Sequence, residues 1–123
     1  MKKLVASALA VFLLTIGFVS PVSANTGAVS ARLGESKDLI ITGEGRYVKF
    51  SCDLYGESSG FPYASGVCHL RKVSNFEGSV LVVDFTDRNE SDDVWLEKGV
   101  KYRLTATNVD ERMPNTTVVA RVQ

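Results

Sequence analysis

The chain has 123 residues, with 14 lysines and arginines and 14 aspartates and glutamates, so its formal net charge at pH 7 is zero. That length suits one domain of ordinary size. The balanced charge offers neither the basic surface that nucleic-acid binding requires nor a polybasic segment for anionic lipid, so we expect no nucleic-acid partner.

The first 24 residues have the three parts of a secretory signal peptide. Lys2 and Lys3 form a short basic start typical of bacterial signals, Leu4–Ser20 carries no charge, and Ala24 ends a small-residue cleavage site. A retained membrane anchor is the alternative, but 17 uncharged residues are at the short limit for a bilayer span. We therefore expect cleavage after Ala24, a secreted, extracellular protein and a single domain over residues 25–123.

Short runs of β-branched and aromatic residues, separated by Gly, Asn, Asp and Pro clusters, dominate the rest of the chain. None of it keeps a 3.6-residue apolar period for three turns, so we expect no long helix. The runs predict strands near Ala28–Leu33, Asp38–Thr42, Arg46–Leu54, Val67–Val73, Ser79–Thr86, Val100–Thr107 and Thr116–Val122. Val94–Leu96 either adds a short eighth strand or lies across the end of the sheet. Strands and turns at this spacing are typical of an antiparallel sandwich or barrel.

Cys52 and Cys68 are the only cysteines, and in an exported chain we expect them to form a disulfide. Alternation puts Phe50 and Cys52 on one strand face, and Cys68 and Leu70 on one face of the next strand. We expect these two strands to form a hairpin with Cys52 opposite Cys68 and Phe50 opposite Leu70. A zinc site is the alternative, but His69 is the only further ligand nearby and alternation turns it to the other face, so we expect no metal.

The segment Leu96–Tyr102 has the form L-x-x-G-x-x-Y and leads into an alternating strand. It resembles the tyrosine corner of immunoglobulin-like and fibronectin type III-like sandwiches, which implies an inward Leu, a turning Gly and a Tyr hydroxyl bonded to the backbone upstream. The chain departs from that family because we place its cysteines on adjacent strands and because no Trp lies between them. The expected fold is all-β: a small antiparallel Greek-key β-sandwich of immunoglobulin/fibronectin III-like architecture, with about seven strands and one disulfide.

Catalytic chemistry has little support in the sequence. His69 is the only histidine and adjoins a cysteine that we expect to be oxidised, which leaves no Ser-His-Asp or Cys-His arrangement. The chain has no nucleophile elbow, phosphate loop or dinucleotide fingerprint. Asp84, Asp87, Asp92 and Asp93 are better explained as solvated loop charge than as paired glycosidase acids. We expect no catalytic residues, no enzyme activity and no cofactor.

The acidic segment Asp87–Asp93 suggests a calcium loop, because alternate residues carry side-chain oxygens. The EF-hand pattern fails in two places: Asp92 stands where the loop needs a turning Gly, and Lys98 stands where it needs a bidentate Glu. We therefore expect an ordinary acidic turn.

The segment between the cysteines carries three aromatic residues, Tyr55, Phe61 and Tyr63, among Gly, Ser and Pro. Amphipathic rings beside small polar residues suit the recognition of protein or sugar surfaces, so these three are the candidate binding residues. In the alternative interpretation, Phe61 folds back over the core and both tyrosines lie flat on the sheet. Trp95 has apolar neighbours on both sides, which places it in the core.

The function that fits these features is a secreted binding or interaction module. It would use the aromatic, disulfide-clipped loop to contact an extracellular protein, a glycan or a cell-wall component, or to inhibit an enzyme. The alternative is a self-associating structural or matrix protein of the cell surface, joined through sheet edges or apolar patches. Thr116–Val122 would serve if it lay on an edge, but we expect it to be an ordinary paired strand. After signal removal the chain has 12 basic and 14 acidic residues. We expect a monomer that is not membrane-embedded.

Overall fold

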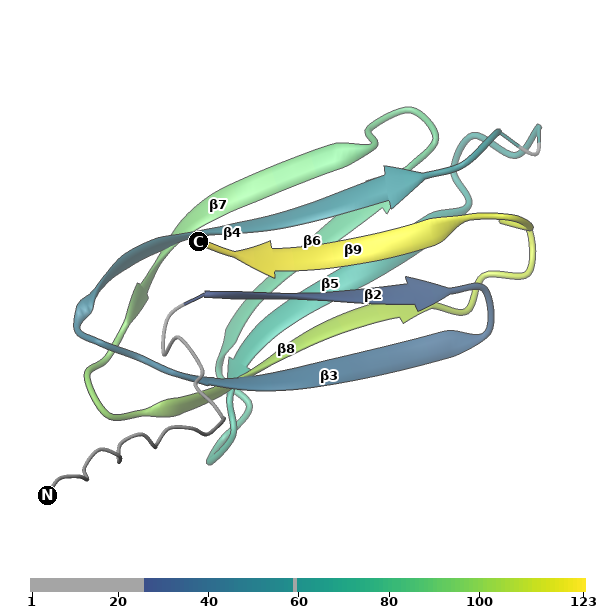
Figure 1. Cartoon of the computed structure of the whole chain (residues 1–123). Coiled ribbons are helices and arrows are strands. Elements are labelled where there is room, and N and C mark those ends of the chain that lie inside the picture. Colours follow the sequence, from purple (N-terminus) through teal and green to yellow (C-terminus); the bar gives the residue numbers. More distant parts are fainter. Residues whose placement is uncertain (1–25, 59) are drawn as a thin grey trace, which may run out of the picture.

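The computed structural model describes residues 26–58 and 60–123, so the predicted signal peptide and its cleavage site lie outside the described residues (Figure 1). The described residues form eight strands and no helix. The strands are β2 (Gly27–Arg32), β3 (Glu35–Thr42), β4 (Arg46–Tyr55), β5 (Ser65–Lys72), β6 (Gly78–Asp84), β7 (Asn89–Leu96), β8 (Lys101–Asn108) and β9 (Thr117–Val122). All seven predicted strands are present.

The strands make two antiparallel sheets, in the orders β2-β9-β4-β7 and β3-β8-β5-β6 (Figure 1). The pairs are nested along the chain: β5 pairs with β6, β4 with β7, β3 with β8 and β2 with β9. This confirms the antiparallel β-sandwich. The nested order is that of a jelly roll, a double-sheet fold built from two Greek keys, whereas immunoglobulin sandwiches order their strands as ABED and CFG.

Nesting decides which connections meet in space. The β2–β3, β4–β5, β6–β7 and β8–β9 connections gather at one end of the sandwich, and the other three gather at the opposite end (Figure 1). We call the first of these the loop end. Segments distant in sequence are neighbours there: Leu33 of the β2–β3 connection lies beside Pro114 and Asn115 of the β8–β9 connection.

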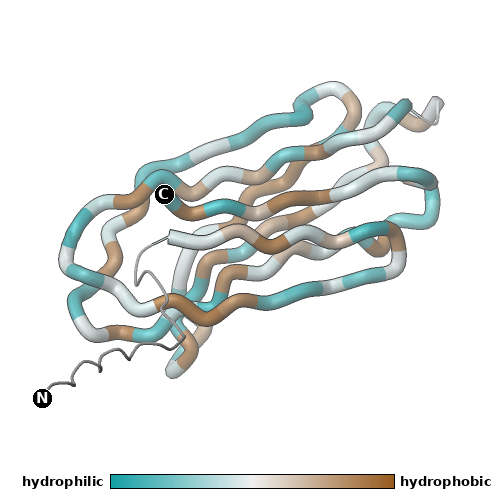
Figure 2. Tube along the Cα trace, viewed as in Figure 1, coloured by the Kyte–Doolittle hydropathy of each residue, from teal (hydrophilic) through white to brown (hydrophobic). Residues whose placement is uncertain are grey.

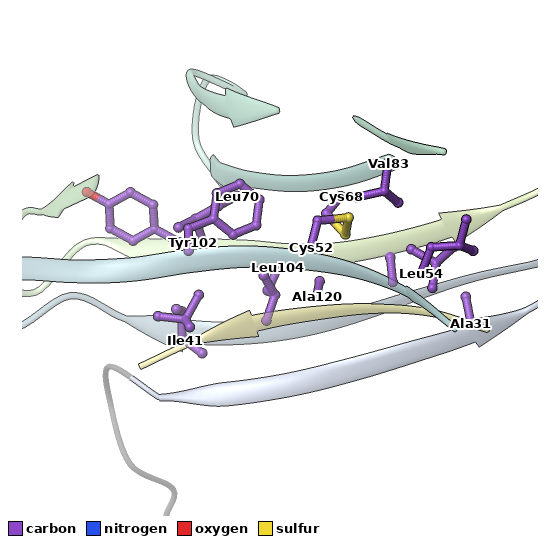
Figure 3. Packing of buried hydrophobic residues seen from close by; sticks show 14 of the residues in the cluster. Ala31, Ile41, Cys52, Leu54, Cys68, Leu70, Val83, Tyr102, Leu104 and Ala120 are labelled. Atoms are coloured by element: carbon purple, nitrogen blue, oxygen red, sulfur yellow. A yellow bond between two sulfur atoms is a disulfide. The ribbon is translucent and has the colours of Figure 1, made fainter. Parts of the chain in front are cut away.

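The core lies between the sheets, where buried side chains of both sheets meet (Figure 3). Hydrophobic positions recur along the strands (Figure 2). Along β4, Val48, Phe50, Cys52 and Leu54 are buried, as their alternation predicted. Burying one such aliphatic or aromatic side chain contributes about 1.5–3 kcal/mol relative to leaving it exposed. The other strands complete the core with Ala31, Ile41, Cys68, Leu70, Val83, Leu96, Tyr102, Leu104, Ala106, Val118, Ala120 and Val122.

Cys52 and Cys68 form the predicted disulfide, but the predicted hairpin between their strands is wrong (Figure 3). Cys52 lies on β4 in one sheet and Cys68 on β5 in the other, so the bridge crosses the core. Alternation correctly predicted that both cysteines face inward. Two inward-facing cysteines can meet across the core from facing sheets as well as across a hairpin, so alternation could not decide between these two arrangements.

Small residues let the two sheets converge at the bridge. Facing sheets normally lie about 10 Å apart, yet the Cα atoms of Cys52 and Cys68 are 5.8 Å apart. Cys52 has Ala120 beside it on β9, and Cys68 has Ala106 beside it on β8. Both alanines are fully buried. Larger side chains at these two positions would hold the sheets too far apart for the disulfide.

The tyrosine corner is present at the entry to β8. The Glu97 backbone N–H donates a hydrogen bond of 2.9 Å to the Tyr102 hydroxyl, the upstream bond that the sequence resemblance implies. Leu96 is buried, and Gly99 turns the chain with a φ of 80°. The corner therefore closes the end of the sandwich opposite the loop end.

Candidate functional site

The three candidate binding residues are exposed near the loop end. Tyr55 is 49% exposed, Phe61 53% and Tyr63 76%. The proposed fold-back of Phe61 over the core is therefore wrong, because Phe61 leaves half its surface in solvent. Tyr55 does lie on the outer face of its sheet, where its hydroxyl is 3.4 Å from Nη1 of Arg121.

The β4–β5 connection, residues 56–64, is tied to the rest of the loop end by backbone contacts. The Ala64 N–H donates to the Phe61 carbonyl at 3.0 Å, and the Phe85 N–H donates to the Pro62 carbonyl at 3.2 Å. Ala64 itself is fully buried. These bonds present the turn that carries Phe61 and Tyr63 on a fixed base, so less freedom is lost when a partner binds.

Asp110 joins the β8–β9 connection to the start of β5. Its Oδ2 accepts a hydrogen bond from the Ser65 backbone N–H at 3.1 Å, and its carboxylate takes two bonds from the Arg112 guanidinium, at 2.9 and 2.7 Å. The Arg112 side chain, helped by the backbone N–H groups of Arg112 and Ser65, holds the pKa of Asp110 far below its usual value. Asp110 is therefore ionised in the folded protein even in moderately acidic solution.

The Asp110→Asn variant is expected to lose about 1 kcal/mol of stability at pH 7, because the bonds to Arg112 lose their charge. A carboxyl whose pKa is lowered on folding stabilises the protein above its unfolded pKa of about 3.9, and that contribution fades as the pH falls toward the folded pKa. The variant should therefore show a shallower loss of stability between about pH 5 and pH 2. Urea unfolding at a series of pH values measures this, with the exposed neighbour Glu111→Gln as control. An unchanged acid slope would contradict the assignment.

Two surface grooves flank a ridge formed by Pro114 and Asn115. One, of about 630 Å³, is lined on its other side by Arg32, Leu33 and Glu35. The other, of about 350 Å³, lies between the ridge and residues 56–58 of the β4–β5 connection, which carries Phe61 and Tyr63 and is called the aromatic connection below. Asn115 has a φ of 59°, in the left-handed region that Asn tolerates better than most residues. This part of the site was not predicted from the sequence, although Pro114 and Asn115 are residues typical of a turn.

A further pair of exposed aromatic residues, Tyr47 and Trp95, lies far from the loop end. Trp95 on β7 is 50% exposed, so its predicted core position is wrong. It packs edge to face on Tyr47 of β4, with ring centroids 5.2 Å apart and planes at 72°. The two residues are cross-strand partners on the outer face of their sheet. Val94 and Leu96 face the core, so Trp95 between them faces outward in an alternating strand. Its apolar neighbours therefore led to the wrong prediction that Trp95 is buried.

The prediction that Asp87–Asp93 forms an acidic turn is also wrong. The turn is short and ends near Asp87, whose N–H donates to Oδ1 of Asp84 at 2.7 Å. From Asn89 onward the chain is β7, and its side chains alternate between two faces of the strand. Asn89, Ser91 and Asp93 share one of these faces, but an extended strand spaces alternate residues about 6.7 Å apart, so their oxygens do not converge as a calcium loop requires. Among residues 26–58 and 60–123, no group of three or more His, Cys, Asp or Glu side chains is placed to hold a metal ion.

His69 lies half-buried on the outer face of β5, opposite to the inward-facing Cys68, as alternation predicted. Its strand neighbours are Thr105 on β8 and Val80 on β6. Burial lowers the pKa of His69, and the positive charge of Arg71 lowers it further. Its Nδ1 is buried without a hydrogen-bond partner among the described residues, so no carboxylate orients the ring through that atom.

Comparison with known proteins adds no family to this picture, because no family model matches the chain and no curated protein matches it either. Within the described part of the chain, no helix has the length and apolarity needed to cross a membrane.

Proposed function

We propose that the protein is a secreted binding module that contacts an extracellular protein or glycan through its loop end. The observation that carries the proposal is the exposure of Tyr55, Phe61 and Tyr63 near one end of a disulfide-linked sandwich. Aromatic residues are enriched at the centre of protein interfaces because they bury a large area at small entropic cost. Exposed rings on a tethered loop therefore favour recognition over a purely structural role.

The grooves beside the Pro114–Asn115 ridge support the same location. The smaller groove shares residues 56–58 with the aromatic connection, so a bound chain could contact rings and groove together. Concave surfaces with a few polar groups beside apolar ones are the usual form of ligand sites. The ligand would meet hydroxyl, amide and backbone groups there as well as rings.

Capture by the oxidised protein tests the proposal. Residues 25–123 contain every described strand and both cysteines, so this segment is the bait against surface and secreted fractions of the producing cell. The Tyr55→Ala/Phe61→Ala/Tyr63→Ala variant should weaken binding of the captured partner about a hundredfold or more, because a few central aromatics carry most interface energy.

The Tyr47→Ala/Trp95→Ala variant is the matched control, because it removes exposed aromatic rings from a different part of the surface. It should leave partner affinity within about threefold, a difference of under 1 kcal/mol. Equal affinity of the loop variant and the unaltered protein would overturn the proposal. Loss with the control variant alone would move the site to Tyr47 and Trp95.

The alternative of a self-associating structural protein finds no support at Thr116–Val122. As expected for an ordinary paired strand, β9 has a neighbour on both sides, β2 and β4. An internal strand has no free backbone groups with which to recruit another chain.

A further inference from the structure

Each sheet has two edge strands: β2 and β7 in one, β3 and β6 in the other. Natural proteins protect such edges with charges or by covering them. β7 carries Glu90, Asp92 and Asp93, and β3 carries Glu35, Lys37 and Asp38. On β2, Gly27 lies against the Leu39 side chain of β3.

The β6 edge lacks that protection. Residues 78–83 read Gly-Ser-Val-Leu-Val-Val, and the only charge in the strand is Asp84 at its end. Val80 is 55% exposed and Val82 51% exposed, both on the outer face. Among the described residues, β6 has a single strand neighbour, β5. An exposed, uncharged, β-branched edge is the kind that pairs with another strand.

The hydrogen-bond pattern shows which backbone groups of β6 point outward. The Lys72 N–H donates to the Glu77 carbonyl at 2.8 Å, so even-numbered residues of β5 bond toward β6. The Val73 N–H donates to Lys101 of β8, as the alternation requires. Odd-numbered residues of β6 therefore bond to β5, and the N–H and C=O groups of Val80 and Val82 point away from the sheet.

The edge is complementary to itself. In an antiparallel pair of β6 strands with its two-fold axis at Leu81, Val80 lies opposite Val82 of the second copy, and Val82 opposite its Val80. All four of these residues direct their N–H and C=O groups at the other copy, which allows four hydrogen bonds. The valine side chains meet on one face, where β-branched cross-strand pairs are stabilising.

Charge complementarity selects the same register. Asp84 of one copy lies opposite Gly78 of the other, and Gly78 is flanked on its own sheet by Arg71. Gly78 has no side chain, and an added Cβ would lie 2.0 Å from the Leu70 carbonyl oxygen. Arg71 is therefore separated from the second copy's Asp84 by a bare strand, about 10 Å between Cα atoms at ordinary strand spacing. The two side chains can span that distance, so two ion pairs would flank the valines.

We propose that two copies of this chain pair through β6 into a two-fold dimer with one continuous sheet across both. The self-complementary contacts are those of an isologous interface. Because the paired strands are antiparallel, the two loop ends point in opposite directions, so each remains open. The proposal replaces the monomer expected from the sequence, and it is independent of what the loop end binds.

Sedimentation velocity of the oxidised 25–123 protein tests the pairing at concentrations from about 1 µM to 1 mM, in about 0.15 M salt to screen distant charges. We expect a concentration-dependent monomer–dimer equilibrium. The Val82→Lys variant should raise the dimer dissociation constant tenfold or more, and Arg71→Ala should raise it severalfold. Val109→Lys changes an exposed valine of the β8–β9 connection and should leave the dissociation constant unchanged.

A protein that sediments as a monomer throughout this range would overturn the proposal. A dimer that Val82→Lys does not weaken, or that Val109→Lys weakens equally, would also overturn it, because the interface would then lie elsewhere. Circular dichroism should show an intact sandwich in each variant, since all three side chains are at the surface. The loop variant Tyr55→Ala/Phe61→Ala/Tyr63→Ala should still dimerise, which separates this test from that of the binding site.

Discussion

Replacing both cysteines, in the Cys52→Ala/Cys68→Ala variant, is expected to lower the free energy of unfolding by about 3 kcal/mol. The bridge closes a loop across a sequence separation of 16, and opening it restores chain entropy to the unfolded state. Both cysteines are fully buried between the sheets, so their loss also leaves unfilled volume in the core. The bridge is the only covalent link between the two sheets among the described residues other than the chain itself.

Urea unfolding of the variant and of the unaltered protein, each with and without a thiol reductant, measures this effect. The reductant should bring the unaltered protein close to the variant and leave the variant unchanged. If the variant lost less than about 1 kcal/mol, the loop-closure account would fail. A variant that remained sensitive to the reductant would show that the effect does not come from this disulfide.

The sequence allowed the inward faces of most strands to be predicted. In β4 the alternation of Val48, Phe50, Cys52 and Leu54 with polar residues reflects burial on one face, and the structure confirms each position. The tyrosine corner was readable for a similar reason, because its Gly and Tyr act over a few residues of contiguous chain. Local periodicity and local turns depend only on residues that are close in the sequence, so they can be predicted from it.

Strand partnership was not predictable in the same way. Phe50 and Leu70 were expected to pair, but Phe50 lies beside Val122 and Leu70 beside Leu104. A period of two says which side chains face the core and leaves open which sheet contains the strand. The connection of residues 56–64 was long enough to cross between sheets, so nothing local decided between a hairpin and a crossing.

The candidate site was only partly predictable for the same reason. Tyr55, Phe61 and Tyr63 were identified from composition, because rings among Gly, Ser and Pro are hard to bury together. The Pro114–Asn115 ridge comes from the far end of the chain and meets the aromatic connection only through the nesting of β4, β5, β8 and β9. The open β6 edge likewise follows from the strand order and not from residues 78–84 alone.

The Asn108→Ala variant is the second change expected to have a large effect, again about 3 kcal/mol of unfolding free energy. Asn108 is fully buried, and its amide donates to the carbonyls of Ala31 and Thr116 at 3.3 and 3.2 Å and to the Thr116 hydroxyl at 3.1 Å. It thereby links β2, the end of β8 and the entry to β9 beneath the Pro114–Asn115 ridge. Alanine would leave buried acceptors unpaired, each costing about 1–3 kcal/mol.

Two comparisons show whether the donors or the volume of Asn108 matter, both measured by urea unfolding at pH 7. Asn108→Asp keeps the volume but places an acceptor against the carbonyls, so we expect it to cost at least as much as Asn108→Ala. Val109→Ala changes an exposed neighbour and should stay within about 0.5 kcal/mol of the unaltered protein. Near-normal stability of Asn108→Asp would show that the site needs a filled volume and not these hydrogen bonds. The buried amide holds the β8–β9 connection in place, and the ridge beside the β4–β5 connection depends on it.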